Sequence, residues 1–319
     1  MPNIKELRFL GHCHSSFSLL DAVSSPKDYI KYACEHSVPF VTLTEHNQLS
    51  NQYNLFEAAK GTGIQAISGN EIYLDLSKEF DGKDVYSHLT VTAYNDAGRR
   101  NLFLLFNKSF NKMSKPRWGH KKAINTWEDL IEHKEGLYVG SGCVISPMAR
   151  SLIKGRPDLA VIYLDKLLDI FGPNNIYAEF MPGSAMWDWD RKTSAWVANK
   201  CNEHFPSGDL VKDYQLWLWE HGVIKRKMKP VLTTDSHMVH AHEKSTQDLI
   251  LMSAENGWRF HDTLDIPVKE EMYAKLIYLP GFNESVYDSL IVNGEEFGSR
   301  VKYEKPLTDG KIKLPEFLP

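Results

Sequence analysis

The sequence lacks several features that would direct it to familiar classes of protein. Its 319 residues include only four cysteines, without a Cys-x-x-Cys spacing, and we recognise no signal peptide. This cysteine pattern excludes a disulfide-rich secreted scaffold and suits a reducing compartment. No apolar run approaches the length of a transmembrane helix, and there is no low-complexity tract or short internal repeat. We therefore expect a cytoplasmic protein with no membrane partner.

The sequence also lacks a strong charge bias. Its net charge is −4, so overall charge predicts no nucleic-acid partner, and any such binding must come from a local patch. No glycine-rich turn follows the first apolar run, which disfavours an open doubly wound sheet. Hydrophobic residues make up 42% of the chain, enough to form the core of one large domain or two modest ones.

What the chain does contain begins with a pair of histidines. Residues 7–10 form a short, mainly apolar run that predicts a buried strand, and His12 and His14 follow it. Because side chains alternate along an extended backbone, the two imidazoles point the same way. They could supply half of a metal site, although an isolated His-x-His pair is more often structural.

The same succession of an apolar run and a polar donor recurs along the chain. The patterns predict strands at 39–47, 64–71, 87–94, 136–143, 176–180 and 229–237. They predict helices starting at Pro26, at 51–60, at 158–171, at 188–204 and at 210–221, and Asp96 is expected to cap a further helix. About seven alternating βα units favour an α/β barrel with a parallel sheet, in which the strand ends converge on one face.

Nine side chains that can bind metals lie at or near these strand ends: His12, His14, Asp21, His46, Glu71, His88, Cys143, Asp235 and His237. Burying so many imidazoles and carboxylates without a cation would be costly. The mixture of N, O and S donors suits Zn²⁺, Mn²⁺ or iron better than calcium, and nine donors suit two or three divalent ions. Such centres activate water and clamp phosphoryl oxygens, so phosphate-ester hydrolysis is the first prediction and amide hydrolysis the competing one.

At these residues the chain resembles the polymerase and histidinol phosphatase (PHP) family, close to the branch at the N-terminus of bacterial DNA polymerase III alpha subunits. The motifs that carry the resemblance are residues 12–21, 44–47, 69–71, 88–91, 141–143 and 233–237. The resemblance implies a distorted (β/α)₇ TIM-like barrel with a short C-terminal extension, and a trinuclear centre held by the nine donors. It also implies a metal-dependent 3′–5′ exonuclease able to proofread, with catalytic roles for Asp21, His46, Glu71 and Asp235.

The resemblance extends to domain organisation and partners. It implies a phosphoesterase barrel over 1–260 and an extension over 261–319 that is similar to the linker to a polymerase palm. The chain would then be an excised domain or one piece of a split polymerase, in a bacterial cell or a phage-infected host. Its expected partners are the 3′ end of a DNA primer strand and the remaining polymerase domains or subunit.

A basic loop that follows the helix expected after the strand at 87–94 is the candidate DNA contact. It would act through Lys112, Lys115, Arg117, Lys121 and Lys122, with an aromatic side chain available for base stacking. A basic loop is equally typical of an ordinary solvated surface.

Two alternative functions remain open. A small-molecule phosphatase of the histidinol-phosphate type would use the same metals but favour a phosphomonoester. An inactive structural module would brace a polymerase palm, as in family members that have lost ligands. Glu45 and Ala22 depart from the family pattern, where aspartate and glycine are common, but neither is a ligand in the implied scheme.

Overall fold

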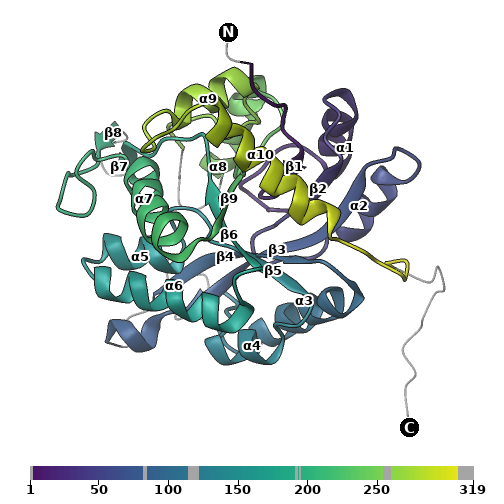
Figure 1. Ribbon diagram of the computed structural model, residues 1–319, viewed down its shortest axis with the longest axis horizontal. Coiled ribbons are helices and arrows are strands. Elements are labelled where there is room, and N and C mark those ends of the chain that lie inside the picture. Colours follow the sequence, from purple (N-terminus) through teal and green to yellow (C-terminus); the bar gives the residue numbers. More distant parts are fainter. Residues whose placement is uncertain are drawn as a thin grey trace.

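A seven-stranded sheet, with strand order β1-β2-β3-β4-β5-β6-β9, forms the centre of the protein. The computed structural model describes residues 3–81, 85–113, 122–190, 193, 195–253 and 260–307. The two edges of the sheet meet just beyond β1 and β9, where Cys13 and Ser236 form a parallel bridge and the His14 amide donates to the Ser236 carbonyl at 2.7 Å. The sheet is therefore a nearly closed barrel, with helices packed around it (Figure 1).

The strands that build the barrel are mostly short. They are β1 (Phe9–Leu10), β2 (Phe40–Leu43), β3 (Gln65–Asp75), β4 (Tyr86–Ala93), β5 (Leu137–Gly140), β6 (Ile176–Phe180) and β9 (Lys229–Leu232). β4 pairs antiparallel with both β3 and β5, so the prediction of a wholly parallel sheet is wrong at this strand. The connection between β3 and β4, residues 76–85, is too short for the crossover that parallel neighbours require.

The reversal of β4 matters for the placement of His88. Because β4 runs against its neighbours, its N-terminal end lies at the edge of the barrel where the parallel strands end. His88 is near the start of β4 and pairs with Tyr73 in the last part of β3. His88, near the N-terminal end of β4, therefore lies beside residues at the C-terminal ends of the parallel strands.

Helices cover the outside of the barrel. They are α1 (Pro26–Glu35), α2 (Gln52–Ala59), α3 (Asp96–Ser109), α4 (Trp127–Glu132), α5 (Pro147–Ile153), α6 (Pro157–Phe171), α7 (Leu210–Leu218), α8 (Lys244–Ser253), α9 (Lys269–Leu276) and α10 (Glu284–Ser299). Short 3₁₀ helices form η1 (Ser77–Phe80) and η3 (Ala241–Glu243), and η2 (Trp219–Ile224) is a π-helical segment that follows α7. Ser25 caps α1 as predicted. The cap of α3 is Asn95 rather than Asp96, because its side chain accepts from the Gly98 amide at 2.8 Å.

The predicted helix over 188–204 is wrong. The structure has an antiparallel hairpin there, formed by β7 (Trp187–Asp190) and β8 (Ala195–Ala198). Aromatic and acidic residues alternate along 187–190, a period of two that is typical of a strand and that the helix prediction overlooked.

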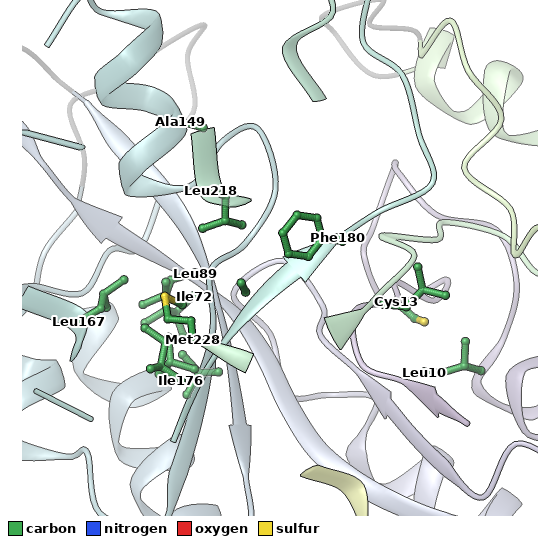
Figure 2. Close-up of a cluster of buried hydrophobic side chains, with 14 of the residues drawn as sticks. Leu10, Cys13, Ile72, Leu89, Ala149, Leu167, Ile176, Phe180, Leu218 and Met228 are labelled. Atoms are coloured by element: carbon green, nitrogen blue, oxygen red, sulfur yellow. The ribbon is translucent and has the colours of Figure 1, made fainter. Parts of the chain in front are cut away.

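The core fills the barrel and the space beneath the helices. Figure 2 shows Ile72 and Ile176 near Leu167 from α6, with Leu218 from α7 above them, and Leu10 in a separate part of the same cluster. A second apolar cluster at the starts of the strands packs against α10, with Phe297 among its members. This leaves the opposite end of the barrel, where the strands finish, for polar residues. Within the described residues, no helix is both long and apolar enough to cross a membrane.

Candidate metal centre

Glu71 lies at the centre of the polar cluster at the strand ends. Its Oε1 is 3.4 Å from His12 Nε2, and its Oε2 is 2.7 Å from His46 Nδ1 and 3.1 Å from His88 Nδ1. The thiol of Cys143 lies 3.9 Å from Glu71 Oε1. Only 1% of the Glu71 side chain is exposed, so one buried carboxylate links donors from four other segments of the chain.

Asp235 provides a second carboxylate, next to the His-x-His pair. Its Oδ1 lies 3.3 Å from Nε2 of His12 and 3.3 Å from Nε2 of His14. The two imidazoles therefore point toward the same carboxylate oxygen, as expected for side chains that alternate along one extended segment. Cys13, between them, faces the core and is fully buried.

Asp21 provides a third carboxylate on the more open side of the cluster. Its Oδ2 is 2.7 Å from His46 Nε2 and 3.3 Å from His237 Nε2. About a fifth of the Asp21 and His46 side chains is exposed, at 18% and 20%. The nine predicted donors thus meet in one place. Asp21 and His46, together with the equally exposed Asp235, form its solvent-facing side.

The cluster fits divalent cations. Four buried atoms, His12 Nε2, His14 Nε2, His46 Nδ1 and Glu71 Oε2, have no hydrogen-bond partner; the last two are close together but lack hydrogen-bond geometry. Unpaired buried lone pairs are costly unless a cation takes them up. Within the part of the chain that the structure describes, three overlapping sets have ligand atoms within 4.8 Å of one another: His14 with His46 and His237, His12 with His14 and Glu71, and His46 with Glu71 and His88.

The electrostatics of the site also suit cation binding. Burial, together with the nearby His46 and His237, lowers the pKa of His14 to about 3, so this imidazole is neutral and keeps a lone pair. Burial alone would raise the pKa of Glu71, but His88 and His46 outweigh it and hold that pKa well below its usual range. His14 and Glu71 therefore have the protonation states that metal ligands need. His12 and His46 differ, because burial lowers the pKa of each imidazole but nearby carboxylates outweigh it and raise that pKa, so each must lose a proton on ligation.

Two carboxylates behind the cluster were missed as functional residues. Glu179 lies on β6 with its side chain fully buried, and its Oε2 is 2.8 Å from His12 Nδ1. Glu45 was noted only as a departure from the family pattern, yet it is also fully buried and bonded to Ser18, a neighbour of His14. The available signal for Glu179 was an acidic residue within the otherwise uncharged run 176–180.

Part of the predicted basic loop borders the centre. Lys112 forms an ion pair with Asp75, and Lys122 Nζ lies 5.6 Å from the ring centroid of Tyr73. Tyr73 in turn stacks on His88, with ring centroids 4.6 Å apart. Lys115, Arg117 and Lys121 fall outside the described residues, and DNA contact by the loop stays a prediction.

The fold and site together define a class: an α/β barrel that gathers imidazoles, carboxylates and a thiol at the ends of its strands. Comparison with known proteins then identifies the family. Residues 11–183 match the family model described as the PHP domain, and the chain belongs to this family.

Relatives found by sequence include DNA polymerase III alpha subunits. The subunit of Chlamydia pneumoniae is 31% identical over 166 residues, which cover 50% of this chain and 13% of that protein. The subunit of Thermus aquaticus is 32% identical over 171 residues, again 50% of this chain and 13% of that protein. The chain is therefore homologous to the N-terminal PHP region of these subunits and matches only a small part of their length.

Among solved structures, a provisionally assigned metal-dependent phosphoesterase of Bifidobacterium adolescentis is similar, with a TM-score of 0.41 and 10% sequence identity. That comparison covers 86% of this chain and 97% of the other.

Proposed function

We propose that the protein is a metal-dependent phosphoesterase that acts as a 3′–5′ exonuclease on DNA. The observation that carries the proposal is the convergence of the nine potential metal ligands. Four of their buried ligand atoms have no hydrogen-bond partner. Two or three Zn²⁺ or Mn²⁺ ions, or iron, would lower the pKa of a water molecule and stabilise charge on phosphoryl oxygens when bound there. Membership of the PHP family supports the same class of chemistry.

The burial of the side chains indicates which would hold ions and which would face the substrate. His12, His14 and Glu71 are nearly or wholly buried and would hold the ions, together with the Asp235 carboxylate. Asp21 lies on the solvent-facing side, where a phosphate can approach. Its Oδ2 would accept a hydrogen bond from the attacking water and orient it. Burial raises the pKa of Asp21, but His237 and His46 outweigh it and hold that pKa well below its usual range, so the carboxylate stays ionised and is a weak base.

DNA is the proposed substrate for two reasons. The related regions belong to DNA polymerase III alpha subunits, whose name states their role in DNA synthesis. The described end of the basic loop also lies near the centre, because Lys122 lies over Tyr73 and Tyr73 stacks on His88. A cationic rim with an aromatic ring is the usual way to hold a single strand.

A comparison of two substrates tests the proposal. The full chain, supplied with Mn²⁺, is given a primer labelled at its 3′ end and, separately, a small phosphomonoester. We expect release of mononucleotides from the primer, and an Asp235→Asn chain serves as the matched control. Phosphate release from the monoester alone would favour the histidinol-phosphate type of phosphatase. Hydrolysis of neither substrate, with no bound metal, would favour the structural module.

A further inference from the structure

The two histidines of the His-x-His pair each turn their second ring nitrogen toward a buried carboxylate. His12 Nδ1 is 2.8 Å from Glu179 Oε2. His14 Nδ1 is 3.1 Å from Ser18 Oγ, which donates to Glu45 Oε2 at 2.5 Å. We infer that Glu179 and Glu45 are positioning residues that fix the tautomers of His12 and His14, so that both Nε2 lone pairs face the metal centre. This inference rests on the proposed metal centre.

Glu179 acts as an acceptor on both of its oxygens. Oε1 accepts from the Gly142 amide at 2.9 Å, and Oε2 accepts from the Thr233 hydroxyl at 3.1 Å. The nearest group to His12 Nδ1 is therefore an acceptor, and the Thr90 hydroxyl is farther away, at 3.3 Å. The proton of a neutral His12 belongs on Nδ1, which leaves the unpaired Nε2 as the ligand atom.

Glu45 reaches His14 through a hydroxyl. Its carboxylate accepts from the Ser15 amide at 3.0 Å and from Asn51 Nδ2 at 2.9 Å, in addition to Ser18. Because the Ser18 proton points at Glu45, the hydroxyl oxygen offers its lone pair to Nδ1 of His14. The proton of His14 then also lies on Nδ1, and its Nε2 is bare.

Replacement of Glu179 by glutamine keeps the shape of the side chain nearly constant but leaves its hydrogen bonds mismatched. An amide has one acceptor oxygen and one NH₂ group, whereas the site presents donors to both carboxylate oxygens. With NH₂ toward Gly142, two donors face each other. With NH₂ toward His12, Nδ1 must become the acceptor and the proton moves to Nε2, where it blocks the ligand atom. Loss of such supporting contacts lowers metal affinity by about 10–100-fold.

The test measures metal affinity rather than activity. Zn²⁺ binding to the metal-free full chain is followed by competition with a chromophoric chelator, for wild type, Glu179→Gln and Ser18→Ala. The matched control is Asp209→Asn, an acid-to-amide change at a buried carboxylate that caps α7. We expect affinity to fall about 10–100-fold in Glu179→Gln and about tenfold in Ser18→Ala, with the control unchanged. In the Zn²⁺-loaded wild type, nitrogen-15 NMR should find the ring proton of His12 and of His14 on Nδ1, with Nε2 bound to the metal.

The outcomes separate this inference from the proposed function. Wild-type protein that binds Zn²⁺, together with folded variants of unchanged affinity, would overturn the positioning roles and leave the proposed function standing. Wild-type protein that binds no divalent ion would overturn the proposed function itself. If a variant does not fold, the NMR experiment on the Zn²⁺-loaded wild type decides, because a histidine that binds the metal through Nδ1 and keeps its proton on Nε2 contradicts the inference.

Discussion

Replacement of Asp235 by asparagine tests the site at little cost to the fold. The residue has a left-handed backbone, with φ of 49°, a conformation that asparagine tolerates and alanine disfavours. Burial raises the pKa of Asp235, but His12 and His14 outweigh it and lower the value from 3.8 to about 2. At neutral pH this shift corresponds to about 2 kcal/mol of stability, which is lost as pH falls through the folded pKa. A domain stable by roughly 5–15 kcal/mol should still fold without it.

Activity should suffer far more than stability. Asp235 Oδ1 lies 3.3 Å from the ligand nitrogens of both His12 and His14, so the change removes one negative charge from the centre. If about 4 kcal/mol of transition-state stabilisation is lost, nucleotide release slows about a thousandfold. Single-turnover release from a labelled primer measures this rate, and urea unfolding checks the fold. A folded variant with a rate within about threefold of wild type would refute the assigned role.

Three further predictions follow from the same geometry. Chelation should abolish nucleotide release and added Mn²⁺ should restore it in the primer assay; unchanged release after complete metal removal would exclude a metal-dependent reaction. Burial opposes protonation of His46, but Glu71 and Asp21 outweigh it and raise its pKa to about 10, so ligation must displace a proton. Zn²⁺ affinity should therefore fall about tenfold per pH unit on acidification for each proton displaced, and calorimetry in buffers of different ionisation enthalpy should detect proton release; pH-independent binding would contradict this. Gly98→Ala should destabilise the fold by about 2–3 kcal/mol in urea, because a Cβ would lie 1.9 Å from the Gly136 carbonyl oxygen, while metal content per folded chain stays constant.

The convergence of the nine donors could be expected from sequence because a barrel brings strand ends together whatever the loops do. His12, His46 and Asp235 each follow a short apolar run, and that local pattern suffices to place them on one face. Their metal-binding role stays a prediction. The reversal of β4 needed a different kind of reasoning, since it depends on the length of the connection from β3 rather than on any residue in the strand.

The supporting contacts behind the ligands could not be read from the sequence. Glu179 is 167 positions from His12, and their contact requires the barrel to close, so that only β9 lies between β1 and β6. Glu45 is 27 positions from Ser18, and their contact depends on how the turn after β1 folds back onto the end of β2. Such contacts depend on how separate strands pack together, and the pattern of apolar and polar residues along the sequence does not predict that packing.

Elemental analysis of the purified full chain is the most direct test of the metal centre. The account predicts two or three tightly bound divalent transition-metal ions per chain, lost together with activity on chelation and regained on addition of Zn²⁺ or Mn²⁺. A folded chain that carries no such ion, and takes up none when Zn²⁺ and Mn²⁺ are supplied, would contradict it.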